Sequence, residues 1–383
     1  MSILSMESEE YEEWMLESIR LYKDLHDFEL QGPTRVVEWI GDKSICVAGY
    51  DSAKRNEILQ LLIPQKLHAK ENPGLCPERD LKVEHGGFID EPVYSLKHIP
   101  QSSLIVTSGP ASCPLWVWQI GPEDRDVIQP ISTIPSEAGK GTWTRIATTT
   151  SASPQILHGS QADSIRLTDI KSTKQIHTLG VSGSDGVSTL CFLDSRTVFV
   201  CCMNGRQFIA DIRMPGAASE GSVGEEGLSC VTWCSAVHPS KEDVCSTVAS
   251  VSSEGHMCLT DPRNLSVPLK CATWCTPIPA ASEQLLSICW APALSDCISV
   301  SGFGGSVQIF DTKRWDSAMK EREAVFIHKG HSVMGTCEDG REPTVTAHAW
   351  HPWKERTVLS AASDGSLHVW NWSDLPEHDG TEL

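Results

Sequence analysis

The sequence repeats one short pattern, in which a strand-like run is followed by a turn and a second strand. The clearest copy lies at 357–372 and reads TVLSAASDGSLHVWNW. Its middle, Ser363-Asp364-Gly365, has turn chemistry, because Asp can bond its own backbone and Gly readily adopts a positive φ. The apolar and alternating runs on either side are typical of strands. The pattern therefore predicts a β-hairpin near the end of the chain.

Hairpins of this kind recur about every fifty residues, a period typical of propeller blades rather than of helical solenoids. Six copies are clear, and a seventh, at 44–62, is weaker and has a longer turn. The seven copies lie at 44–62, 104–119, 155–169, 197–211, 247–261, 297–311 and 357–372. Seven blades of roughly four strands account for almost the whole chain of 383 residues. We therefore predict an all-β fold, a seven-bladed β-propeller over residues 27–372.

The last copy resembles a WD repeat, the four-stranded blade unit of the WD-repeat family. In that family a Gly-His pair, a strand Ser or Thr, a turn Asp and a strand Trp form a buried hydrogen-bonded set. The matching residues in this chain are His331, which follows Gly330, and Ser360, Asp364 and Trp370. The other copies match the family by pattern and lack the full set. The resemblance implies that these four side chains stabilise the last blade.

Residues 1–26 predict an acidic amphipathic α-helix ahead of the propeller. Its most convincing part runs from Ser8, a potential N-cap, to His26. Most of its charged side chains fall on one face at about 100° per residue. The opposite face carries Tyr11, Trp14, Met15, Ile19, Leu21, Tyr22 and Leu25. Two alternatives remain open: the helix packs against its own propeller, or it is offered partly to a partner.

The end of the chain predicts how the ring closes. After Trp372 only an acidic tail, 373–383, remains, and it is a poor candidate for the outer strand of the last blade. Without that strand the edge of the last sheet would be open. We expect a short strand near 27–31 to fill the place, so that both ends of the chain meet in one sheet.

Three residues of the last blade, His331, Ser360 and Asp364, also have the side chains of a catalytic triad. Catalysis would need an exposed nucleophile beside an oxyanion site. Ser360 instead falls inside a strand, so the set is interpreted as structural, and no Cys pairs complete a zinc-finger spacing. We expect a protein that is not an enzyme, with no cofactor and no metal. The alternative is a propeller hydrolase, which would need inward-facing polar or metal-binding residues from several blades around the central channel.

Charge and cysteine content limit the possible ligands and the cellular location. The formal net charge is −19 and the sequence pI is about 5.1, which disfavours generic binding to nucleic acid. The first residues are acidic and lack the pattern of a signal peptide, and apolar runs stay short of a membrane span. Fifteen cysteines, many inside strand runs, suit reduced thiols. We expect a soluble cytoplasmic protein, with the nucleus as a further location.

A rigid ring with many loops and an appended helix is typical of a scaffold or adaptor for other proteins. Apolar residues of the helix, exposed aromatics in loops and the loop at 332–343 are the candidate partner-binding elements. The candidates are Tyr11, Trp14, Met15, Trp315, Met334 and Trp353.

Over nearly the whole chain the sequence is similar to one group within the WD-repeat family. The stretches that carry this resemblance lie at 20–29, 34–49, 77–88 and 367–375. It implies an assembly or regulatory partner of the RNA-cleaving Integrator subunits, a pair with a metallo-β-lactamase fold. It also implies links to spindle poles, microtubules and cell-cycle progression. The strong negative charge makes direct binding to acidic tubulin tails less favourable than binding to a basic or apolar protein surface.

Overall fold

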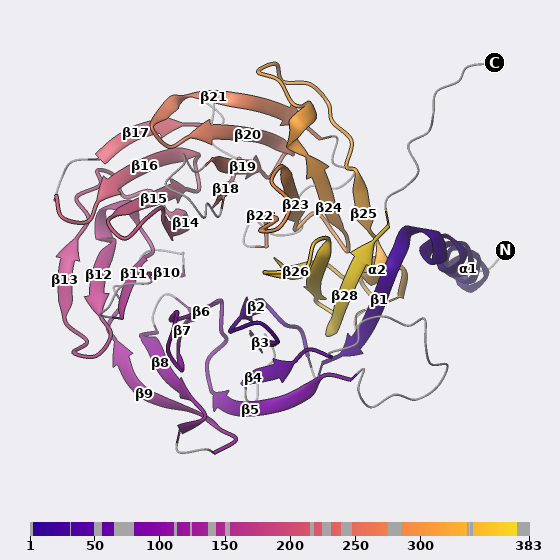
Figure 1. Cartoon of the computed structure of the whole chain (residues 1–383), viewed down its shortest axis with the longest axis horizontal. Coiled ribbons are helices and arrows are strands. Elements are labelled where there is room, and N and C mark those ends of the chain that lie inside the picture. Colours follow the sequence, from indigo (N-terminus) through magenta and orange to yellow (C-terminus); the bar gives the residue numbers. More distant parts are fainter. Residues whose placement is uncertain are drawn as a thin grey trace.

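The fold is a closed ring of seven blades, as shown by a computed structural model of the chain (Figure 1). The structure describes residues 3–30, 32–49, 56–64, 80–110, 113–122, 125–136, 143–149, 154–214, 218–223, 231–238, 247–274, 285–334, 337 and 340–373. Within these residues the strands form seven antiparallel sheets of four strands each. The predicted all-β, seven-bladed propeller is confirmed.

Six blades use four strands that are consecutive in the sequence. The first three blades are β2 (Val36–Trp39), β3 (Ser44–Ala48), β4 (Asn56–Leu62) and β5 (Lys82–Ile89); β6 (Ser95–His98), β7 (Leu104–Ser108), β8 (Leu115–Ile120) and β9 (Ile128–Ile134); and β10 (Arg145–Thr148), β11 (Gln155–Gly159), β12 (Arg166–Asp169) and β13 (Gln175–Thr178). The next three are β14 (Val187–Phe192), β15 (Thr197–Cys202), β16 (Arg206–Asp211) and β17 (Ala218–Ser222); β18 (Trp233–Val237), β19 (Val248–Ser252), β20 (His256–Asp261) and β21 (Asn264–Thr273); and β22 (Ser287–Trp290), β23 (Cys297–Ser301), β24 (Val307–Asp311) and β25 (Phe326–His328).

The seventh blade is assembled from both ends of the chain. Its strands are β26 (Val345–Trp350), β27 (Thr357–Ala362), β28 (Ser366–Trp372) and, on the outside, β1 (Tyr22–Glu29). One long helix and three short helical elements complete the described part of the chain: α1 (Ile3–Leu21), η3 (Ala162–Ser164), η4 (Thr312–Arg314) and α2 (Gly330–Met334). Figure 1 shows indigo β1 lying alongside yellow β28, with α1 outside the ring.

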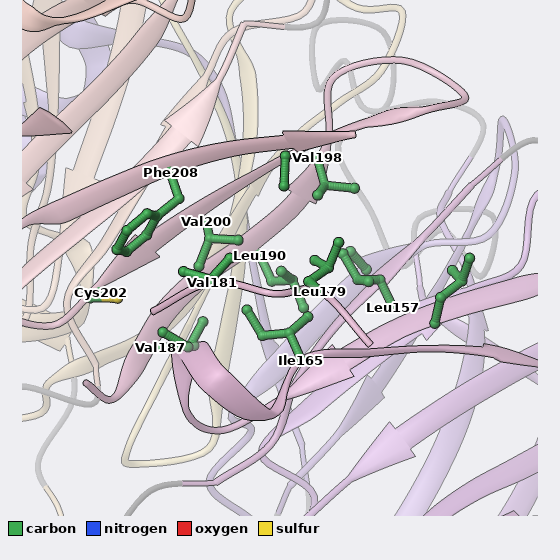
Figure 2. Close-up of a cluster of buried hydrophobic side chains, with 14 residues drawn as sticks. Leu157, Ile165, Leu179, Val181, Val187, Leu190, Val198, Val200, Cys202 and Phe208 are labelled. Atoms are coloured by element: carbon green, nitrogen blue, oxygen red, sulfur yellow. The ribbon is translucent and has the colours of Figure 1, made fainter. Parts of the chain in front are cut away.

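The core lies between neighbouring blades, because each sheet packs against a sheet on both of its faces. The second strands are accordingly buried along their length, as β19 and β27 are at every position. Figure 2 shows one such cluster, formed by side chains of the third and fourth blades, including Leu157, Val200 and Phe208. Burial on both faces explains why these strands are runs of apolar and small residues in the sequence rather than strictly alternating ones.

The closing strand begins earlier than predicted. β1 pairs with β28 in antiparallel register from Tyr22 opposite Trp372 to Glu29 opposite Ser366. Two further backbone bonds extend the pairing, from Leu30 N to Gly365 O (2.9 Å) and from Ser373 N to Leu21 O (2.9 Å). The ring is therefore closed by 22–29 instead of by a strand near 27–31.

The helix boundaries also differ from those predicted from the sequence. α1 starts at Ile3, so Ser8 lies inside it instead of capping it, and it ends at Leu21 instead of His26. Residues 22–26 continue the helical sequence pattern but form a strand, because hydrogen bonds to β28 and burial of Tyr22 in the core stabilise that conformation. Of the tail at 373–383, residues 374–383 lie outside the described residues. In the described part of the chain, no helix is long and apolar enough to cross a membrane.

Removing residues 1–30 tests the closure. This truncation opens the edge of β28 and exposes the apolar surface that Tyr22 covers, so we expect the melting temperature to fall by about 10 °C or more, which corresponds to several kcal/mol for a domain of this size. Differential scanning calorimetry measures the shift. Removing residues 1–13 is the control, because it spares Trp14 and β1 and should change the melting temperature much less. Equal melting temperatures for the 1–30 truncation and the intact chain would contradict the closure.

Candidate functional site

The residues that match the WD set are centred on Ser360, a buried serine of the last blade. Trp370 Nε1 donates to Ser360 Oγ (3.1 Å), and the same oxygen lies 2.8 Å from His331 Nε2. Asp364 is joined to the set indirectly. Its Oδ1 accepts from Ser366 Oγ (2.7 Å), which in turn lies 2.6 Å from His331 Nδ1. The set therefore spans α2, β27, the turn and β28.

If these four hydrogen bonds all run in the same direction, every donated hydrogen has an acceptor. Trp370 donates to Ser360, Ser360 donates to His331 Nε2, His331 Nδ1 donates to Ser366, and Ser366 donates to Asp364. The imidazole is then neutral, in agreement with burial, which holds the pKa of His331 well below its usual value. Ser360 is fully buried, so it is not accessible as a nucleophile. The arrangement stabilises a blade and does not form a catalytic triad.

A second buried network joins the N-terminal strand to the last two blades. Tyr22 OH lies 2.8 Å from His328 Nδ1, and His328 Nε2 lies 3.0 Å from His368 Nδ1. His368 Nε2 in turn lies 3.2 Å from Asp27 Oδ1. No local sequence pattern indicated this network, because Tyr22 lies more than three hundred residues from the histidines in the chain.

The three histidines His328, His331 and His368 are also the one group among the described residues with the geometry to hold a metal ion. Five of their six ring nitrogens, however, lie within hydrogen-bond distance of a polar atom of the protein or of another ring. The sixth, His368 Nε2, makes no hydrogen bond but lies 3.2 Å from Asp27 Oδ1. Burial holds the pKa values of His328 and His331 well below the usual value, so both rings are neutral. The arrangement fits a hydrogen-bonded network better than a metal centre.

A partial WD-like set occurs in the neighbouring blade and was also missed. His348 Nε2 lies 2.8 Å from Ser299 Oγ, and Trp350 Nε1 donates to the same oxygen (2.7 Å). Ser299 is in β23 of the sixth blade, whereas His348 and Trp350 are in β26 of the seventh. The contact therefore ties two blades together. Because it crosses between repeats, the spacing within one repeat gave no signal of it.

The N-terminal helix packs against its own propeller through one side and leaves another side exposed. Trp14 is buried in the cluster that includes Tyr22, Phe326 and Trp372, and α1 also contacts α2. Trp14 is thus a core residue and not a free partner-binding residue, because it anchors the helix. The structure confirms that the helix packs against its own propeller, whereas binding of a partner by its other side stays a prediction.

The exposed side of α1 is apolar, and we call it the helix face. Tyr11, Met15 and Ile19 follow one another at four-residue spacing and are 40%, 43% and 75% exposed, and Leu16 beside them is 70% exposed. The acidic side chains Glu12, Glu13 and Glu17 are exposed on the same helix. Tyr11 and Met15 belong to the apolar stripe predicted from the sequence, whereas Leu16 falls outside it.

The other candidate partner-binding residues are scattered. Trp315 is buried against Phe310 in the core between the fifth and sixth blades, so its assignment as an exposed interface residue is wrong. Met334 is the last residue of α2, which contacts α1, and is 38% exposed. Trp353 is 61% exposed, and its Nε1 donates to Asp42 Oδ1 (2.9 Å). Of the loop at 332–343, residues 335, 336, 338 and 339 lie outside the described residues.

The central channel lends no support to a hydrolase. Its cavity, about 520 Å³, is lined by the inner strands of several blades. Among the described residues that line it and the adjoining cavity, Glu38 and His348 are the members of the His, Asp and Glu types. His348 is held by Ser299 and Ser301. Three converging groups of these types, as a channel hydrolase would need, are not formed by these residues.

Seven blades and the buried His331–Ser360–Trp370 set define a WD-repeat β-propeller. No family model matches the chain. Curated proteins do match it along its length. The Integrator complex assembly factor WDR73 of Xenopus laevis is 98% identical over 369 residues, which cover 96% of this chain and 100% of that protein. The proteins of the same name from Mus musculus and Homo sapiens are 44% and 42% identical, each over 95% of this chain and 98% of their own length. The chain belongs to the WDR73 family.

Ser360→Ala tests the buried set. The substitution leaves His331 Nε2 and Trp370 Nε1 buried without their partner, so we expect the free energy of unfolding to fall by about 2–4 kcal/mol. Urea denaturation of the two proteins measures the difference. Ser172→Ala removes the same hydroxyl from an exposed turn and should change stability by less than about 0.5 kcal/mol. If both variants are equally stable, Ser360 is not a structural centre of the blade.

A second prediction concerns pH. Burial, with a contribution from Arg166, lowers the pKa of His158 to about 4, whereas an unfolded His titrates near 6.5. Below about pH 6.5 the unfolded state binds more protons, so stability falls as the pH falls towards 4. His158→Gln can keep a bond to Thr168 without titrating. Between pH 7 and pH 5 we expect the variant to lose about 2 kcal/mol less than the wild type, as measured by urea denaturation. Parallel pH profiles would show that His158 does not contribute.

Proposed function

We propose that this chain is a non-enzymatic assembly factor of the Integrator complex that acts as a scaffold for its RNA-cleaving subunits. The relatives that carry the name of Integrator assembly factor, 42–98% identical along the chain, support this function. The propeller fold supports a scaffold, because it is rigid and presents loops on both sides of the ring. The observation that carries the proposal is the exposed apolar helix face on an anchored helix.

The helix face is suited to bind another protein. Tyr11, Met15, Leu16 and Ile19 are large side chains, and exposing them together in water is unfavourable unless a partner covers them. Trp14 holds the helix against the propeller before any partner arrives. The ordering cost that a flexible helix would pay on binding is therefore reduced.

The charge of the helix indicates what kind of partner surface it would bind. Glu12, Glu13 and Glu17 border the apolar residues, and the whole chain carries a net charge of −19. The complementary surface is an apolar groove with Lys or Arg along its rim, in the manner of a helix bound in a groove. Among the subunits of the complex, we propose that the RNA-cleaving pair provides this groove.

The site of action that we propose is the cytoplasm, before the complex is complete. Links to the nucleus, spindle poles, microtubules and the cell cycle remain predictions of the sequence. Direct binding to acidic tubulin tails is disfavoured by the same negative charge that favours a basic partner.

The double substitution Leu16→Glu/Ile19→Glu tests the helix face without touching Trp14 or β1. Both residues are exposed, so we expect an unchanged melting temperature but at least about a tenfold loss of the Integrator RNA-cleaving subunits recovered with the tagged protein. Quantitative mass spectrometry of affinity purifications measures the recovery.

The matched control is Val267→Glu/Leu269→Glu. These residues are similarly exposed, 62% and 52%, but lie on β21 in the fifth blade. This variant should recover the subunits as the wild type does. If Leu16→Glu/Ile19→Glu also recovers them fully, the helix face is not the binding surface. If the wild type recovers no Integrator subunit, the proposed function itself is wrong.

A further inference from the structure

Two cysteines of the fifth blade face each other inside the protein. Cys258 lies on β20 and Cys271 on β21, the outermost strand of the blade, and the register of the two strands places them directly opposite each other. Their Sγ atoms are 3.7 Å apart, and the two side chains are 3% and 5% exposed. Both thiols are free in this structure.

The backbone around the pair has the geometry that a disulfide between neighbouring strands needs. Trp274 N donates to Gly255 O (2.9 Å), so these two residues form a hydrogen-bonded pair of the antiparallel ladder. Hydrogen-bonded and non-hydrogen-bonded pairs alternate, which makes Cys258 and Cys271, three positions further along, a non-hydrogen-bonded pair. Cys271 N accordingly points away from β20 and donates to Asp316 O (2.7 Å). In pairs of this kind the Cα atoms are about 4.5 Å apart, which lies within the range that a disulfide spans.

The surroundings keep the two thiols protonated while the blade is closed. Both cysteines belong to a buried cluster that includes Phe199, Trp233 and Leu265. Burial raises the pKa of the Cys258 thiol, and the neighbouring Cys271 is a further cause. Because the thiolate is the reactive form, the pair reacts slowly as long as β20 and β21 stay together.

The outer strand is the side from which the pair becomes accessible. The register of β21 with β20 shifts between Leu259 and Thr260 and again between Thr260 and Asp261, so the ladder is irregular over this part. Val267 and Leu269 of β21 are 62% and 52% exposed. A strand with an irregular ladder and few buried side chains opens locally at a lower free energy than the inner strands do. Local opening of β21 exposes Cys271 to solvent, where its thiol can ionise and react.

β21 also connects the fifth blade to the sixth. Cys271 N bonds the carbonyl oxygen of Asp316, and Lys270 Nζ donates to that of Thr312 (2.9 Å). Asp316 and Thr312 belong to the segment that follows β24 of the sixth blade. A covalent bond between β20 and β21 would therefore fix the strand that carries these contacts between the blades.

We propose that Cys258 and Cys271 are a redox-sensitive pair, which hydrogen peroxide converts into a reversible disulfide between β20 and β21. In the first step one thiolate attacks the peroxide, the O–O bond breaks, and a sulfenic acid and a hydroxide ion form. In the second step the other thiolate attacks the sulfenic sulfur, the S–S bond forms, and hydroxide leaves. The two hydroxide ions take up the two thiol protons. Two thiols and one hydrogen peroxide thus give one disulfide and two water molecules.

The reverse reaction makes the pair a switch. A dithiol reduces the disulfide by thiol–disulfide exchange and restores both thiols. In a compartment where glutathione keeps thiols reduced, the pair stays open until the concentration of peroxide rises. This inference does not depend on the Integrator partner.

Peroxide treatment of the full chain tests the proposal. The folded protein is incubated with hydrogen peroxide at pH 7.5, the remaining thiols are alkylated, and proteolytic fragments are analysed by mass spectrometry. We expect fragments joined through Cys258 and Cys271, which dithiothreitol separates. The bridge restricts the unfolded chain, so we also expect the melting temperature of the oxidised protein to exceed that of the reduced protein by about 2–4 °C.

Variants assign the effect to this pair. Cys258→Ala and Cys271→Ala should each abolish the joined fragments and the rise in melting temperature. Cys297→Ala is the matched control, because it removes a thiol from β23 and keeps the pair, so it should respond as the wild type does. Circular dichroism establishes that each variant is folded. If Cys258→Ala does not fold, Cys271→Ala decides, and the fragments of the wild type need no variant.

Three results would overturn the proposal. The first is the absence of joined Cys258 and Cys271 fragments after peroxide treatment of the folded wild type. The second is their formation only in urea, which would show that the folded blade does not allow the reaction. The third is a rise in melting temperature that persists in Cys271→Ala, which would assign the stabilisation to other cysteines.

Discussion

The pairing of β1 with β28 is the contact on which the rest of the structure depends. A propeller blade has two faces and two edges, and its faces are buried only if a neighbouring blade stands on each side. The N-terminal strand gives the last sheet its fourth strand and, through Tyr22, contributes to the core between the last two blades. The closure links the two ends of the chain and therefore contributes to the packing of every blade.

His328 and His331 support this closure as neutral side chains, because burial holds the pKa of each well below its usual value. His328 and His331 lie with His368 where β1, α2 and the last two blades meet, and their nitrogens are satisfied by protein groups and by one another. A neutral imidazole can donate at one nitrogen and accept at the other, so it links two groups without a buried charge. The same property makes the seam sensitive to acid, since protonation would place a second donor opposite a donor.

The sequence predicted what local chemistry determines and missed what distant contacts determine. The hairpins follow from turn residues and spacing inside a repeat, and the resemblance to the WD repeat implied the His331–Ser360–Trp370 set. The structure has both in place. The end of α1 could not be read in this way, because residues 22–26 continue the helical pattern and become strand only when β28 is beside them. The prediction that Trp315 is exposed failed for a related reason. Its position in a loop suggested exposure, but it follows η4 directly and its ring packs against Phe310. The convergence of Arg145 and Lys97 on the central channel gave no signal, because it depends on the arrangement of whole blades.

Closure of the ring also separates two surfaces of opposite character. On the outside, α1 presents apolar side chains with acidic neighbours, and it is held there by Trp14. On the inside, the inner strands bring together cations from different blades that are far apart in sequence. Bringing like charges together is unfavourable, so the packing of the blades must supply the free energy that keeps Arg35 and Arg145 close.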